Sequence, residues 1–221
     1  MRTTLIEKPA TLPVAWEDIQ HHLHLEQIDP DVQAAEQSYC LLLAGAATNG
    51  ATSILRRALI ETTYETALWP KELGCYSPCG VYLKLPWPNL REILAVKYAG
   101  ADLIEGTDYT ILETSSGEYM QPGTLLFSAT LFGFPCCGGH WYSPGYGSCG
   151  CPDAADKQLQ VRFKAGYGTT PDDVPENVRA WILLRTAAMY ENREEAAAER
   201  SVITMPFCDH LLSTERMLEF S

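Results

Sequence analysis

Basic side chains are scarce in this 221-residue chain. Lys and Arg together number 16, Asp and Glu number 28, and the formal net charge is −12. Proteins that read nucleic acids gain affinity when clustered Lys and Arg release counterions from phosphates. The one short basic cluster here is the pair Arg56 and Arg57. We therefore expect no DNA- or RNA-reading role and no detectable binding of duplex DNA at moderate salt.

Long hydrophobic runs are also missing. A membrane-spanning helix needs about 20 consecutive apolar residues, and no segment of the chain approaches that length. The first residues, Met-Arg-Thr-Thr-Leu-Ile-Glu-Lys-Pro, hold no apolar core of the kind that a secretory signal requires. These absences predict a soluble protein that is made in the cytosol and has no membrane partner.

Familiar catalytic motifs are absent as well. The chain has no Gly-x-Ser-x-Gly, no phosphate-binding glycine loop and no His-Glu-x-x-His. Cys137 and His140 are close enough in sequence to form a nucleophile–base pair, but no third residue that would orient them can be named. We expect a protein without enzymatic activity.

Cysteine, in contrast, is plentiful. Six of the eight cysteines lie in two loop-like segments, 71–80 and 132–156, and Cys40 and Cys208 lie in predicted helical parts, where a buried thiol is the usual role. Zinc sites use four Cys or His ligands, but the usual Cys-x-x-Cys knuckles are absent. A zinc site, disulfides formed outside the cell and free thiols all stay open. The candidate metal ligands are Cys136, Cys137, His140, Cys149 and Cys151.

The cysteine-rich loop supports an alternative function, that of a small metal-binding or redox protein. Cys75 and Cys79 in the first loop segment add to the potential ligands, and zinc would be the cofactor. The histidines at 21, 22 and 24 are ligands in principle. Because no cysteine or carboxylate accompanies them at metal-ligand spacing, solvated side chains are the favoured interpretation.

Residues 172–195 predict one long helix, with a start signal at Asp172 and Asp173, Pro175 in the first turn and strong helix formers behind. Apolar side chains occupy almost every azimuth, and two narrow polar lines interrupt them at heptad spacing: Arg179, Thr186 and Arg193, and Arg185 with Asn192. A helix that is apolar on several sides is buried on several sides. It is either the core helix of a monomer or a helix shared with a neighbouring subunit.

Further helices are predicted at 12–23, at 31–53 after the start signal Asp29-Pro30-Asp31, and at 209–218. Gly50 interrupts the second helix and suggests a bend or an early end. Between the helices the period changes to two, and glycines mark turns. The predicted strands are 62–69, 80–86, 93–98, 108–112, 124–127 and 158–163.

Several short motifs occur in an order that resembles one known family. They are Trp16-Glu17-Asp18-Ile19, the run 55–64 that begins Leu-Arg-Arg-Ala, Leu85-Pro86-Trp87-Pro88, Phe163-Lys164-Ala165-Gly166-Tyr167-Gly168 and Tyr190-Glu191-Asn192-Arg193-Glu194. Together they resemble the head–tail connector (adaptor, head-completion) family of long-tailed bacteriophages, over nearly the whole chain. Segments 71–80 and 132–156 are insertions relative to that pattern, so the resemblance assigns no role to their cysteines.

The resemblance implies an α+β protein, a helical bundle with a small antiparallel β insertion, assembled as a ring that is typically dodecameric. It implies a single connector domain over 1–221, with helical parts 12–59 and 172–221, a β insertion 60–168 and the cysteine-rich loop 132–156. It implies a virion protein at the head–tail interface that contacts itself, the portal protein and a tail, stopper or tail-terminator protein, while DNA passes through its channel without specific binding. The interface candidates are Arg56, Arg57, Arg179, Trp181, Arg185, Tyr190 and Arg193.

Overall fold

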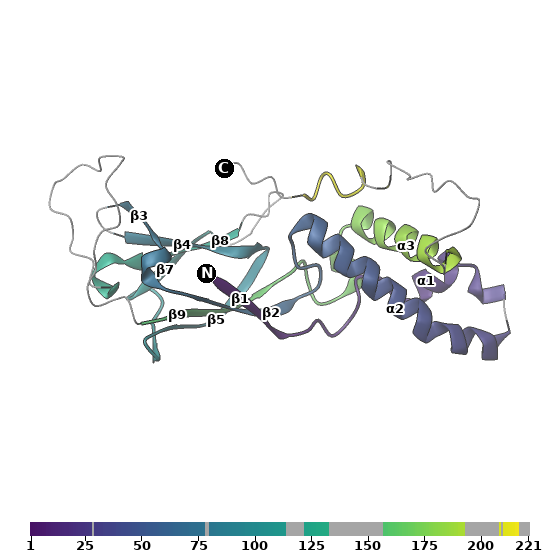
Figure 1. Ribbon diagram of the computed structural model, residues 1–221, viewed down its shortest axis with the longest axis horizontal. Helices are drawn as coiled ribbons and strands as arrows, with labels where there is room; N and C mark the ends of the chain where they lie inside the picture. The colour runs from purple at the N-terminus through teal and green to yellow at the C-terminus, as the bar shows by residue number, and fades with distance from the viewer. Residues whose placement is uncertain are drawn as a thin grey trace. The chain divides into compact units, whose positions relative to one another are not determined.

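The computed structural model of the chain divides into two compact units (Figure 1). The β unit comprises Met1–Lys8 and Glu61–Gly166, and the helical unit comprises Pro9–Ile60 and Tyr167–Ser221. The structure describes residues 1–27, 29–77, 80–113, 122–132, 157–192, 208 and 210–216.

The β unit is built from two antiparallel sheets. One sheet has the strand order β1 (Arg2–Glu7), β2 (Thr62–Leu68), β9 (Leu159–Ala165), β5 (Leu90–Tyr98) and β6 (Ala101–Asp102). The other has the order β3 (Gly74–Ser77), β4 (Gly80–Pro88), β8 (Pro122–Ser128) and β7 (Tyr109–Glu113). Short 3₁₀ turns follow β2 (η2, Pro70–Glu72) and β8 (η3, Ala129–Phe132).

The strand β9 shows why these residues form a sheet. Leu159, Val161 and Phe163 are fully buried, whereas Arg162 between them is exposed, which is the period-two pattern of a strand with one covered face. Phe163 lies opposite Tyr64 of β2, so the central strands place their large side chains in one layer.

Aromatic pairs join that layer to the second sheet. Tyr64 stacks on Trp87 of β4, with ring centroids 5.0 Å apart, and Tyr98 meets Phe132 edge to face at 5.0 Å. Phe132 in turn contacts Phe127 of β8. Aromatic contacts of this kind add to the burial of apolar area. The core of the β unit therefore lies between its two sheets.

The helical unit contains α1 (Trp16–His22), α2 (Pro30–Leu55) and α3 (Glu176–Glu191), with 3₁₀ turns η1 (Leu25–Gln27) and η4 (Pro171–Asp173). The start signal of α2 is confirmed: Asp29 is the N-cap, its side chain accepts a hydrogen bond from the Asp31 amide at 2.9 Å, and Pro30 opens the helix. Gly50 does not end α2, because the helix runs through it to Leu55.

The predicted fold class, a helical bundle with a small β insertion, is wrong. The described residues hold three α-helices against two sheets of five and four strands, so the structure is rich in β. The β part is no simple insertion either, because β1 precedes the first helix and pairs with β2. β1 shows no alternation of buried and exposed residues, since its side chains are almost all exposed. β6 has only two residues, too few to show a period.

The predicted helix at 172–195 begins later than expected. Pro175 is the N-cap of α3 and offers no side-chain bond, while Asp173 instead caps η4 by accepting hydrogen bonds from the amide and hydroxyl of Thr170. The six strands predicted from alternation are confirmed as β2, β4, β5, β7, β8 and β9, with small shifts of their ends. At the C-terminus, residues 211–215 form turns where a helix was predicted.

Candidate functional site

The packing of α2 against α3 organises the helical unit, and the two helices lie side by side in Figure 1. The buried side chains of α2 are mostly small and recur at helical spacing, and α3 opposes them with larger groups. The inward residues are Cys40, Ala44, Ala47, Ala51 and Leu55 on α2, and Val178, Trp181, Ile182 and Thr186 on α3. Small residues on one helix let the other approach closely and leave room for one large indole.

Trp181 occupies that room. Only 2% of it is exposed, and a Cβ built at Gly50 would lie 3.5 Å from the far edge of its ring. The Arg185 guanidinium lies 5.4 Å from the ring centroid, a cation–π distance. Thr186, part of one predicted polar line, is buried, and its hydroxyl donates to the carbonyl of Ile182 at 2.7 Å. The structure thus places Trp181 in the core of this unit.

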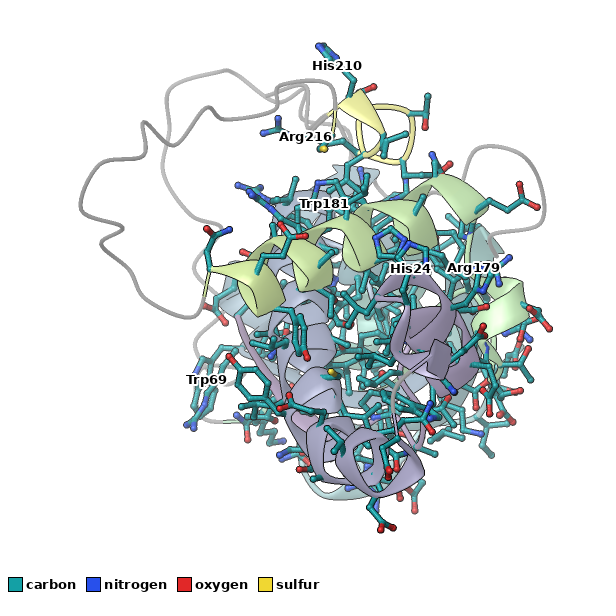
Figure 2. All side chains as sticks on the ribbon, turned by 90° about the vertical axis from the view of Figure 1, so that its right-hand side faces the viewer. His24, Trp69, Arg179, Trp181, His210 and Arg216 are labelled. Carbon is teal, nitrogen blue, oxygen red and sulfur yellow. The ribbon has the colours of Figure 1, made fainter. Side chains whose placement is uncertain are left out.

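Two other interface candidates, Tyr190 and Arg179, lie near opposite ends of α3. Tyr190 is half-buried, and its ring centroid lies 6.2 Å from that of Tyr39 on α2. Near the start of α3, Nη1 of Arg179 donates to Asp172 at 3.1 Å, an ion pair whose carboxylate is almost fully exposed. Figure 2 shows Arg179 and Trp181 on the same helix. Arg193 lies outside the described residues.

Arg56 and Arg57 are adjacent but have different roles. Arg56 is exposed and ends α2 in the left-handed region (φ 54, ψ 40), where glycine is the usual residue because a side chain there costs about 1–2 kcal/mol. Arg57 is 8% exposed and faces the interior. The basic pair that the sequence singles out therefore presents one surface cation and one buried cation.

The buried cation belongs to a polar cluster with Tyr167 and Glu215. The Tyr167 hydroxyl donates to Oε2 of Glu215 at 2.8 Å, and Tyr167 is 7% exposed. The pKa of Tyr167 is raised well above its ordinary value, mainly because burial disfavours the phenolate. The Glu215 carboxylate raises it further, because it accepts a hydrogen bond from the neutral hydroxyl and would repel the phenolate charge. A hydrogen bond and the charge of Arg57 act in the opposite direction on this pKa.

A second set of contacts holds the C-terminal segment 210–216, to which Glu215 belongs. Nδ2 of Asn177, in the first turn of α3, donates to the carbonyl of Leu211 and lies 2.9 Å from the hydroxyl of Thr214. Leu212 is 2% exposed. His210 is exposed, and Figure 2 shows it and Arg216 on this segment. Sequence reasoning missed this docking, because no local motif links Tyr167 to a residue 48 positions away.

The outer face of the five-stranded sheet carries paired charges. Arg162 of β9 donates to Glu65 of β2 at 2.8 Å, and Lys164 lies 3.3 Å from Glu61 and 3.6 Å from Glu92. The hydrogen bond from Lys164 to Glu61 is the main cause of a raised Lys164 pKa. Because carboxylates neutralise these cations, this face offers phosphate groups little net attraction.

The candidate zinc ligands Cys136, Cys137, His140, Cys149 and Cys151 lie outside the described residues, as does Cys79. Within the part of the chain that the structure describes, no group of three or more His, Cys, Asp or Glu could hold a metal ion. His21 lies 3.4 Å from Glu26 with both side chains more than half exposed, which fits the solvated interpretation. Cys40 is buried, as predicted, and Cys208 is half-buried.

No helix among the described residues has both the length and the apolar character that a bilayer span requires. No protein-family model matches the sequence, and no curated protein matches it. Solved structures do match. A chain in the neck of an empty GTA particle, computed with C6 symmetry, has a TM-score of 0.62 at 18% identity. A chain in the virion of a native gene transfer agent (GTA) particle scores 0.66 at 17% identity.

A third match, in the neck of a native GTA particle computed with C12 symmetry, scores 0.61 at 16% identity. Each match covers 100% of this chain and 98% of the other chain. This chain therefore shares, from end to end, the fold of chains found in the necks and virions of these particles.

Proposed function

We propose that the chain is a structural protein of the neck of a tailed, phage-like particle, where copies of it form a closed ring beneath the portal and join the DNA-filled head to the tail. The observation that carries the proposal is the fold shared over the full length with chains of GTA necks. The order of the sequence motifs, which resembles head–tail connector proteins, supports it independently.

The ring is proposed as a dodecamer. The necks that contain the similar chains were computed with C12 and C6 symmetry, and twelve copies satisfy both. The partners are further copies of the chain, the portal on one side, and a tail, stopper or tail-terminator protein on the other. The role requires assembly surfaces and involves no catalysis.

Charge fits this role. With a net charge of −12, the chain repels phosphate on average, so DNA in the channel of such a ring would slide past without being held. We expect acidic side chains on whichever surface lines the channel, and Arg56 to contact acidic groups of a neighbouring copy or of the portal. Tight, salt-sensitive binding of duplex DNA by the purified protein would contradict this part of the proposal.

The test is to locate the chain in a particle. Particles should be purified from cells in which the chain carries a small tag, and their necks should be imaged by electron microscopy. A tagged ring with twelve copies below the portal is the expected result. If the chain is found only as a free monomer outside mature particles, the proposed function is wrong. Metal analysis of the same preparation tests the metal-binding alternative, since stoichiometric zinc in a monomer would favour it.

A further inference from the structure

We propose that the outward face of α2 is the seam on which a second copy of this chain packs. This inference rests on the proposed ring and adds which surface closes it. At 100° per residue, the residues of this face lie within about 100° of one another, opposite the buried stripe that faces α3. The outward face comprises Ala35, Ser38, Leu42, Gly45, Ala46, Asn49 and Ser53; Gly45 is half-buried and the rest are exposed.

The outward face is unusual because it has no charge. Residues 37–55 contain no Asp, Glu, Lys or Arg, although 20% of the chain is charged and about four charged residues would be expected in a stretch of this length. At its centre Leu42 is 68% exposed, the highest exposure among the large hydrophobic side chains of the described residues. An exposed helix normally carries charged side chains on its solvent side.

Gly45 gives a second, independent observation. Glycine inside a helix costs about 1 kcal/mol relative to alanine. Apart from the nearby backbone of α2 itself, no heavy atom of the described residues lies within 4 Å of a Cβ built at Gly45, so packing within the chain does not require glycine there. Gly50 differs, because it faces the Trp181 ring. A helix from outside that packs closely on α2 would account for glycine at position 45.

Charge identifies the occupant as a second copy. Neighbouring copies that each carry −12 repel one another, and a seam with no charged groups avoids adding close like-charge contacts to that repulsion. A phosphate-bearing partner would need cations, which this face lacks. In a closed ring each copy contacts the next copy through the same pair of surfaces. If the outward face of α2 is one of these surfaces, it is covered on every copy.

The experiment compares ring formation in particles assembled with Leu42→Glu, Gly45→Leu or Ile104→Glu as the only copy of the chain. Ile104 is the matched control, since it is 65% exposed but lies in the β unit. The two α2 variants should reduce the number of rings at least tenfold, while Ile104→Glu retains them. Circular dichroism of the purified variants should show an unchanged helical signal, because neither α2 change touches the buried stripe.

Each result decides between the two proposals. Normal rings with both α2 variants would overturn the seam and leave the proposed function intact. Loss of rings with Ile104→Glu as well would show that the effect is not specific to α2, and would also overturn the seam. Absence of rings with the unaltered chain would refute the proposed function and the seam together. A photoreactive residue at position 42 should in addition crosslink to another copy of the chain; an adduct with a different protein would overturn the seam.

Discussion

Replacing Trp181 by alanine should lower the stability of the helical unit far more than a substitution at its surface does. Trp181 is 2% exposed and fills the space above the small residues of α2. Truncating a buried tryptophan to alanine typically costs about 3–5 kcal/mol, because apolar burial is lost and a cavity remains. The cation–π contact with Arg185 adds about 0.5–1 kcal/mol to this loss, the range for a contact whose cation is exposed to solvent. A total loss of about 4–6 kcal/mol is therefore expected.

The measurement is urea unfolding followed by the helical circular dichroism signal, with Trp69→Ala as the control. Trp69 is 36% exposed, so the same truncation there removes less buried area and should cost clearly less than at Trp181. For a chain of this size, the Trp181 change should also lower the melting temperature by roughly 10 °C. Arg185→Gln, which keeps the indole, should cost no more than about 1 kcal/mol.

Equal, small losses for Trp181→Ala and Trp69→Ala would refute the reasoning, since they would mean that Trp181 is not packed between α2 and α3. A loss confined to ring assembly, with the unfolding of the isolated chain unchanged, would also refute it. That second result would place Trp181 at a contact between copies, the role that the sequence suggested for it.

The remaining predictions concern two glycines and one tyrosine. Gly123→Ala should destabilise the β unit by about 1–3 kcal/mol in urea unfolding, because the new Cβ would overlap Leu90. An increase in stability for this variant would contradict the packing of β8 on β5. Gly45→Ala, in contrast, should stabilise the isolated chain by up to about 1 kcal/mol. Tyr167→Phe removes the hydrogen bond to Glu215 and leaves the contacts of Asn177 in place, so it should loosen the segment 210–216 and speed its cleavage in limited proteolysis. Unchanged cleavage would mean that the hydrogen bond to Glu215 does not hold the segment. Because the folded pKa of Tyr167 lies above its unfolded value near 10, its contribution to stability is complete below pH 10 and is lost as the pH rises further, so the urea midpoint should fall above pH 10 in the unaltered chain and fall less in Tyr167→Phe.

Elements whose signals are local could be predicted from the amino-acid sequence. β9 was predicted because Leu159, Val161 and Phe163 alternate with polar residues, and its buried face follows from that alternation. α2 was predicted from the start signal Asp29-Pro30-Asp31 and the apolar side chains at helical spacing that follow it, and Asp29 caps the helix as expected. The net charge, which argues against binding DNA, needs no structure at all.

Elements that depend on a partner far along the chain could not be predicted and are seen only in the folded protein. β1 has exposed side chains and becomes a strand only because β2, some sixty residues later, offers it a hydrogen-bonded edge. The same holds for the candidate site. The spacing of apolar residues predicted that α3 is apolar on several sides. Only the packing of α2 on α3 shows that Trp181 points inward and that the uncharged, outward face of α2 stays exposed. Periodicity records which side chains share a face; the free energy of burial, which depends on what covers that face, is settled only when the chain has folded.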